Sequence, residues 1–130
     1  MVGGLGWSGD LTKWKRYMPN DPLKQLVASW HVYDFGACGS DPTCWRANVR
    51  GVGNAAPVLL GEIGETDCAH GFVDTFMRWL DRRNIGYVAW TWDDWNACND
   101  GPTLITNYDG TPTGYGVGIR HHFVRRFGSP

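Results

Sequence analysis

One glutamate of this chain stands where residue type and spacing indicate chemistry. Glu62 lies in the segment PVLLGEIG at residues 57–64, where a short apolar run ends between two glycines. Glutamate is disfavoured in strands and costly to bury, so a glutamate here is either paired with another group or used in a reaction. The chain has one other glutamate, Glu65, in the same stretch. Glu62 is therefore the candidate catalytic carboxylate, with a salt-bridged strand end as the alternative.

Hydrophobic periodicity predicts the elements that must position this glutamate. Strands are expected at residues 26–33, 58–62 and 87–92, after the tail of a first strand at residues 1–5. Helices are expected within residues 10–18, near 45–49, and over 72–80 and 116–127. Apolar strands separated by helices indicate a parallel sheet covered on both faces. A chain of 130 residues fits one α/β domain with a buried core.

Alternation along each strand assigns its side chains to one of two faces. By this parity the inward faces are expected to present His31, Tyr33, Leu60, Glu62 and Trp90. Trp92 follows Trp90 on the same side of the last strand. The 8 tryptophans exceed what a core of this size needs. Flat indole rings are platforms for sugars and also core filler, so both interpretations stay open for Trp7, Trp92 and Trp95.

Composition excludes several classes of function. The formal net charge of −1 gives no electrostatic attraction to nucleic acid or to an anionic membrane. No apolar stretch approaches the length of a membrane span, and the first residues lack the pattern of a signal peptide. Basic residues within 116–127, from Arg120 to Arg126 and including His121 and His122, are interpreted as a solvated helix face. We expect no nucleic-acid or membrane partner and no cofactor.

The four cysteines, Cys38, Cys44, Cys68 and Cys98, are even in number and lie in loop-like sequence. Disulfides formed in an oxidising compartment fit this pattern best. A zinc site that uses them together with His70 is the alternative, although the chain has no Cys-x-x-Cys pair.

In order and spacing, four segments resemble the second half of the catalytic barrel of glycoside hydrolase family 5, the cellulase and mannanase family. The segment at residues 57–64 resembles the nucleophile motif of the seventh strand, and SWHVY at 29–33 resembles the His-x-Tyr of the sixth. YVAWTW at 87–92 is similar to the eighth strand, which carries a sugar-stacking tryptophan. GGLGWSGDL at 3–11 is similar to the end of the fifth. The resemblance implies that residues 1–130 form half of a (β/α)8 TIM barrel, strands five to eight with their helices.

The resemblance also implies a retaining β-glycosidase, which needs two carboxyl groups about 5–5.5 Å apart. Glu62 would be the nucleophile, with Tyr33 donating a hydrogen bond to it and His31 contacting the substrate or the acid/base. Trp90 would stack beneath the sugar at the cleavage point, with Trp92 and Trp7 as further platforms. The ligand would be a β-linked polysaccharide or oligosaccharide. Glu65 is expected on the rim.

One departure from the family is large. In the family, the acid/base glutamate follows an asparagine at the end of the fourth strand, whereas this chain has no Asn-Glu pair and no third glutamate. We therefore expect a fragment, from a truncated gene or a designed half-barrel, or a site completed by another polypeptide. The chain would be active only when complemented, or inert with residual carbohydrate binding. In an unrelated α/β binding protein, the matching residues would be coincidental.

Further expectations concern crosslinks and assembly. Cys38 is expected to pair with Cys44 across turn-forming residues, and Cys68 with Cys98 between the loops after strands seven and eight. The parent enzyme would be secreted. Four strands cannot close a barrel, so we expect a homodimer, because burying ~500 Å² of apolar surface per chain is worth roughly 12 kcal/mol before the costs of association. In that dimer Asp93 or Asp94 would approach the partner's nucleophile, a route to catalysis that we do not expect to work because aspartate is short.

Overall fold

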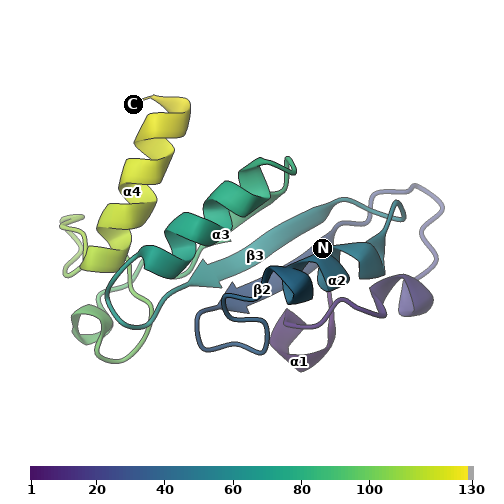
Figure 1. The fold of residues 1–130 in the computed structure, drawn as a ribbon, viewed down its shortest axis with the longest axis horizontal. Helices are drawn as coiled ribbons and strands as arrows, with labels where there is room; N and C mark the ends of the chain where they lie inside the picture. Colours follow the sequence, from purple (N-terminus) through teal and green to yellow (C-terminus); the bar gives the residue numbers. More distant parts are fainter. Residues whose placement is uncertain (129–130) are drawn as a thin grey trace.

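The computed structural model describes residues 1–128 and contains one parallel sheet with four strands in the order β1-β2-β3-β4. The strands are β1 (Val2–Gly3), β2 (Ala28–Tyr33), β3 (Val58–Gly64) and β4 (Gly86–Ala89). The helices are α1 (Leu5–Ser8), α2 (Pro42–Val52), α3 (Gly71–Asp81) and α4 (Gly114–Phe127), with 3-10 turns η1 (Trp14–Tyr17) and η2 (Trp95–Cys98). The chain therefore repeats a strand-then-helix unit, and the predicted α/β class is confirmed (Figure 1).

The last strand is shorter than the expected 87–92. β4 ends at Ala89; the amide of Trp90 still donates to the carbonyl of Ile63 in β3 at 2.9 Å, but from Thr91 on the chain pairs with a loop. The amide of Thr91 donates to the carbonyl of Pro102 at 2.7 Å, and the carbonyl of Thr91 accepts from the amide of Leu104 at 2.9 Å. Trp90 therefore lies at the very end of the sheet, and Trp92 lies beyond it on an irregular segment.

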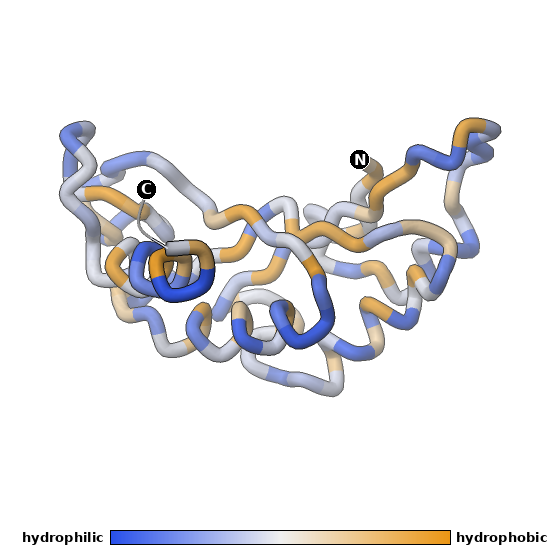
Figure 2. Tube along the Cα trace, turned by 90° about the horizontal axis from the view of Figure 1, so that it is seen from above, coloured by the Kyte–Doolittle hydropathy of each residue, from blue (hydrophilic) through white to orange (hydrophobic). Residues whose placement is uncertain are grey.

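The helices cover only one face of the sheet, so the expectation of a sheet covered on both faces is wrong. Figure 2 shows the chain as an open arc, with helices along its outer side. Trp30 of β2 is buried on that side, and its ring packs edge-on to Phe76 of α3 at 5.9 Å between centroids. His31 and Tyr33 of the same strand point to the other face and are partly exposed. The concave face is thus free to carry a site.

An irregularity in β3 decides which face receives the candidate carboxylate. Trp30 pairs with Leu60, but the next residue of β2, His31, pairs with Glu62, so Gly61 is an extra residue in β3. Leu60 is fully buried on the helix side. The predicted common face for Leu60 and Glu62 is therefore wrong, because a bulge reverses the alternation between them. Without this bulge, a buried Leu60 would direct Glu62 into the core.

Aromatic rings from α2 and α3 form the centre of the core. Trp45 of α2 lies 4.6 Å from Phe76 and 5.4 Å from Trp79, measured between ring centroids. The predicted apolar stripe of α3 is buried as expected, at Phe72, Val73, Phe76, Met77 and Leu80. Aromatic rings bury much apolar area per residue, so a single layer of helices can form a substantial core on one side of the sheet.

Glu65, which was expected on the rim, is instead buried and caps a helix. Its side chain is 3% exposed, and its two carboxylate oxygens accept the amides of Phe72 at 3.1 Å and Val73 at 3.0 Å. These amides belong to the first turn of α3, where backbone donors have no partner within the helix. The expectation was wrong because β3 continues to Gly64, which places Glu65 against the start of α3 rather than in an open loop.

Both predicted disulfides are present. Cys38 joins Cys44 with 5.3 Å between Cα atoms, and Cys68 joins Cys98 with 5.6 Å. The alternative of a zinc site is wrong, because all four cysteines are used in these crosslinks. The second disulfide ties the segment after β3 to the end of η2.

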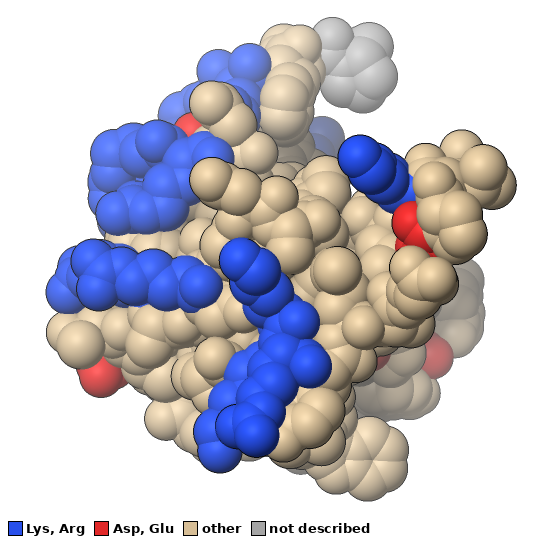
Figure 3. Space-filling model, turned by 90° about the vertical axis from the view of Figure 1, so that its right-hand side faces the viewer, with Lys and Arg blue, Asp and Glu red and all other residues tan. Residues whose placement is uncertain are grey.

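Cationic side chains gather at the end of the molecule where the strands begin, as Figure 3 shows. Arg50 lies in the last turn of α2, where a cation is favourable beside the helix C-terminus. The interpretation of α4 as carrying a solvated basic face is wrong for His122, whereas Arg126 is exposed and also forms an ion pair. His122 is buried with its Nε2 2.9 Å from Asp81, and Arg126 binds the same carboxylate at 3.2 Å. None of the helices within residues 1–128 combines the length and apolarity needed to cross a membrane.

The position of Glu65 yields a stability prediction. Glu65→Ala removes both acceptors from the buried first turn of α3, so we expect the free energy of unfolding to fall by about 2 kcal/mol. Urea denaturation measures the change. Asp100→Ala, at an exposed loop position, is the matched control and should shift stability by less than ~0.5 kcal/mol. Equal stabilities for the two variants would contradict the capping role.

Candidate active site

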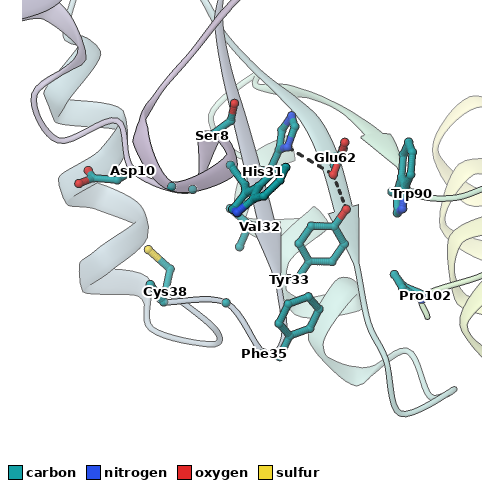
Figure 4. A pocket seen from close by; sticks show the side chains of 15 residues that line it. Ser8, Asp10, His31, Val32, Tyr33, Phe35, Cys38, Glu62, Trp90 and Pro102 are labelled. Atoms are coloured by element: carbon teal, nitrogen blue, oxygen red, sulfur yellow. Dashed lines mark hydrogen bonds and ion pairs between the residues drawn. The ribbon is translucent and has the colours of Figure 1, made fainter. Parts of the chain in front are cut away.

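The candidate site lies on the open face, where β2 and β3 end and the chain leaves β4. Its pocket has a volume of about 640 Å³ and is lined by His31, Tyr33, Glu62, Trp90 and Trp7, among others. Figure 4 shows Glu62 between the rings of His31 and Tyr33 on one side and Trp90 on the other. The four residues that the sequence placed around one reaction centre are therefore together in space.

Two side chains of β2 hold the carboxylate of Glu62. The hydroxyl of Tyr33 donates a hydrogen bond to Oε2, and Nδ1 of His31 lies 3.3 Å from the same oxygen. Burial, followed by the hydrogen bond to Glu62 and its charge, raises the pKa of Tyr33 far above the ordinary 10.0. Tyr33 therefore remains a proton donor at neutral pH, and it orients the carboxylate while leaving Oε1 free of these two contacts.

The two glycines beside Glu62 make room for these rings. A Cβ atom at Gly61 would lie 2.5 Å from Oγ of Ser29 and 2.9 Å from Nε2 of His31. At Gly64 it would lie 2.7 Å from Cε1 of Tyr33, which no side chain tolerates without displacement. The Gly-Glu-Ile-Gly pattern is thus explained by packing, since each glycine clears the space for one partner of Glu62.

Tyr115 is a positioning residue that the sequence did not reveal. Its hydroxyl lies 2.9 Å from the carbonyl of Ile63 and 3.1 Å from that of Trp90, so one proton is shared between the two segments that flank the pocket. Burial is the main cause that raises the pKa of Tyr115, followed by the charge of Glu65. The available signal was Thr113, whose hydroxyl caps α4 by accepting the amide of Gly116 at 3.0 Å. An α4 starting after Thr113 includes Tyr115, whereas the expected helix began one residue beyond it.

The predicted sugar platforms separate into two places. Trp90 is 40% exposed beside Glu62, and its back is supported by Trp95 with 6.4 Å between ring centroids. Trp7 also lines the pocket and is almost fully exposed. Trp92 instead lines a different groove, between β4 and α4, so it does not extend the platform of Trp90. The cause is the early end of β4, beyond which strand parity no longer applies.

Within residues 1–128, one carboxylate besides Glu62 lines the pocket, that of Asp10. Its Oδ1 accepts the amide of Thr12 at 2.8 Å and the hydroxyl of Thr12 at 2.7 Å, and these bonds lower its pKa. Figure 4 shows Asp10 directed away from Glu62. A carboxyl group with a lowered pKa is a poor proton donor, so Asp10 does not suit the role of general acid.

Asp93 is also engaged elsewhere. Its Oδ1 accepts the hydroxyl of Tyr108 at 2.8 Å and the amide of Asp94 at 2.8 Å. Glu65 is fixed beneath α3, as described above. The described residues thus arrange one oriented carboxylate and a sugar-sized aromatic platform.

The model of the family described as "Cellulase (glycosyl hydrolase family 5)" matches residues 1–96, which include Glu62, His31, Tyr33 and Trp90. The chain belongs to glycosyl hydrolase family 5. No curated protein matches it.

Solved structures with the same fold include endocellulases and an endo-β-1,4-glucanase. The hyperthermophilic endocellulase of Pyrococcus horikoshii has a TM-score of 0.61 at 24% identity, over 88% of this chain and 36% of that one. A complex of the endocellulase from Pyrococcus horikoshii with cellotetraose has a TM-score of 0.65 at 20% identity, over 95% of this chain and 37% of that one. A triple variant of the endo-β-1,4-glucanase of Xanthomonas axonopodis pv. citri has a TM-score of 0.65 at 16% identity, over 96% of this chain and 48% of that one.

These identities show the fold, and the chain spans only 36–48% of the length of these structures. Its four parallel strands and helices correspond to a part of the family 5 TIM barrel. The glycoside hydrolase resemblance predicted from four short segments is thereby confirmed at the level of family and fold.

The packing of Gly64 against Tyr33 yields a second prediction. Gly64→Ala should push the Tyr33 ring away from Glu62, because a methyl group there would meet the ring at 2.7 Å and Pro102 at 3.0 Å. The pKa of Tyr33 should then fall toward 10.0. Phenolate absorbance during alkaline titration measures it, with Tyr33→Phe identifying which step belongs to Tyr33.

The raised pKa of Tyr33 also sets how the stability of the fold depends on pH. A raised pKa in the folded state means that Tyr33 stabilises the fold fully below pH ~10, and that this contribution is lost as pH rises through the folded-state pKa. Gly71→Ala is the control, because a Cβ at Gly71 meets no atom within 4 Å. An unchanged Tyr33 titration in Gly64→Ala would refute the packing argument.

Proposed function

We propose that this chain is the glucan-binding half of a retaining β-glycosidase, with Glu62 as its nucleophile. The observation that carries the proposal is the arrangement of Glu62, whose Oε2 is held by Tyr33 and His31 on an open face beside Trp90. A nucleophile must be ionised and aimed, and a tyrosine that stays protonated supplies both effects through one hydrogen bond. His31 would contact the substrate or the acid/base.

The proposed ligand is a β-linked glucan oligosaccharide. Trp90 offers a flat, partly exposed indole next to the carboxylate, where a pyranose ring can stack while its anomeric carbon faces Glu62. The Pyrococcus horikoshii endocellulase, which shares this fold, has been solved with cellotetraose. Trp7, at the other side of the pocket, is a candidate for a neighbouring sugar unit.

We infer that the second carboxyl group of a retaining mechanism comes from outside residues 1–128. Such a group acts from about 5–5.5 Å away and needs a raised pKa to protonate the leaving oxygen. Glu65 is used as a helix cap and Asp10 has a lowered pKa, so neither suits the role. Hydrolysis of unactivated glucan would then require complementation. The lack of a suitable second carboxyl group in the pocket of residues 1–128 also favours a second candidate function, carbohydrate binding without turnover.

The proposed assembly is a homodimer that joins the open edges of two sheets. Beside β1 lies a groove of about 400 Å³ lined by Leu5, Trp14 and Tyr17, and beside β4 and α4 lies one of about 1000 Å³ lined by Val88, Trp92 and Phe127. A two-fold axis along the strands would place the β4 edge of one copy beside the β1 edge of the other, with all strands parallel. Closure in this way removes both edges. Asp93, already bonded to Tyr108, remains a poor candidate for acid in trans.

The proposed location of the parent enzyme is outside the cell. Two disulfides that tie the loops of the site persist only in an oxidising compartment.

Covalent labelling tests the nucleophile without the missing acid. A fluorinated dinitrophenyl β-cellobioside has a leaving group that needs no protonation, so Glu62 alone should displace it and stay glycosylated. Mass spectrometry of the peptide that contains residue 62 should show one added glycosyl group. Glu62→Gln should abolish the label while leaving the fold intact.

Asp10→Asn is the matched control, since it changes the other carboxylate of the pocket and should keep the label. In a complemented enzyme Glu62→Gln should also reduce turnover by roughly 10⁴-fold or more. Labelling at a different residue, or in Glu62→Gln, would assign the role elsewhere. An unlabelled wild-type chain that still binds cellotetraose would favour the non-catalytic alternative.

A further prediction concerns the dimer. Light scattering at micromolar concentration should give twice the mass of one chain, and Val88→Lys should shift it toward one chain, because a charged side chain on the exposed β4 edge opposes pairing. Thr75→Lys, on the exposed side of α3, should leave the dimer unchanged. A monomeric wild-type chain would refute the assembly.

A further inference from the structure

Phe35 is an exposed aromatic side chain in the pocket that the proposed catalytic arrangement does not use. It lies two residues beyond the end of β2, lines the pocket together with Glu62 and Trp90, and is 68% exposed. A single exposed apolar residue is common on protein surfaces, so exposure alone assigns no role. Its ring orientation and the rigidity of its loop are two further observations.

The ring of Phe35 stacks on the ring of Tyr33, with 5.1 Å between centroids and 25° between planes. Tyr33 is the residue whose hydroxyl binds the carboxylate of Glu62. Figure 4 shows Phe35 next to Tyr33, at the end of that ring away from Glu62, whereas Trp90 lies beside Glu62. An oligosaccharide whose reacting unit lies on Trp90 and Glu62 would therefore meet Phe35 with a different unit.

The loop that carries Phe35 is fixed on both sides of this residue. The carboxylate of Asp34 accepts the hydroxyl of Thr66 at 3.0 Å, which ties the loop to the segment after β3. The amide of Gly36 donates to the carbonyl of Tyr33 at 3.0 Å, and the Cys38–Cys44 disulfide closes the loop beyond. A side chain presented by such a loop is already ordered, so binding to it costs little conformational entropy.

We propose that Phe35 is a sugar platform for a different unit from the one on Trp90, and that it makes the site selective for longer unbranched β-linked glucans. The inference rests on the proposed function. The faces of a β-linked glucose ring carry axial C–H groups that pack on an aromatic ring, and a Phe ring has no polar atom that competes with this contact. Two separate platforms, Trp90 and Phe35, give a chain of several sugar units more contact than a single unit receives.

Calorimetric titration of the folded chain with cellobiose and cellotetraose tests the inference. Phe35→Ala should weaken cellotetraose binding by roughly tenfold, which corresponds to about 1.4 kcal/mol, and should change cellobiose binding much less. Phe35→Leu should lose as much as Phe35→Ala, since it keeps apolar bulk against Tyr33 but has no flat ring. Phe35→Tyr should retain the affinity. Trp90→Ala should weaken both ligands.

The outcomes separate this inference from the function on which it rests. Cellotetraose affinity that falls in Trp90→Ala but not in Phe35→Ala would overturn the platform at Phe35 alone. Retained affinity in Phe35→Leu would also overturn it, because the side chain would then act only by supporting Tyr33. A wild-type chain that binds neither sugar, or a Trp90→Ala variant that binds both normally, would overturn the proposed function and this inference with it.

Discussion

The arrangement of this site depends on one extra residue in β3. Gly61 shifts the register between β2 and β3, so that Leu60 enters the core while Glu62 turns to the open face. A regular strand cannot bury Leu60 and also present Glu62 beside Tyr33, because side chains two apart share a face. The bulge thus combines a core contact and an oriented, partly exposed carboxylate within three residues. Glycine at this position also leaves space for the His31 ring.

Contacts from α3, α4 and a disulfide fix the end of β3 that carries Glu62. Glu65 fixes the end of β3 to the first turn of α3, and Tyr115 of α4 bonds to the carbonyls of Ile63 and Trp90. The disulfide between Cys68 and Cys98 ties the loops that follow. Glu62 lies in β3 and Trp90 directly follows the neighbouring strand β4, and these contacts set their separation. Orientation of a carboxylate and a platform requires supports of this kind, because a free loop would spread both over many positions.

The open edges of the sheet account for the apolar surface of the molecule. In a closed barrel every strand has two neighbours, whereas β1 and β4 here each have one. Val88 and Trp92 near β4, and Leu5 and Tyr17 near β1, are exposed as a consequence. The helix layer, by contrast, is complete enough to bury the rings of Trp45 and Phe76. This asymmetry explains how a sheet covered on one side can have a well-packed core and still expose apolar side chains along its edges.

The α/β class, the family, the two disulfides and the grouping of His31, Tyr33, Glu62 and Trp90 could be predicted from the residues alone. Those features depend on local patterns: apolar runs, turn-forming residues around Cys38, and the spacing of His31, Tyr33, Glu62 and Trp90. Features that depend on contacts between distant segments could be identified only in the folded chain. Pairing with β2 created the bulge at Gly61, the start of α3 captured Glu65, and the loop at Pro102 ended β4 before Trp92. Likewise, Tyr115 is a positioning residue only because α4 packs against the ends of two strands that lie far from it in the chain.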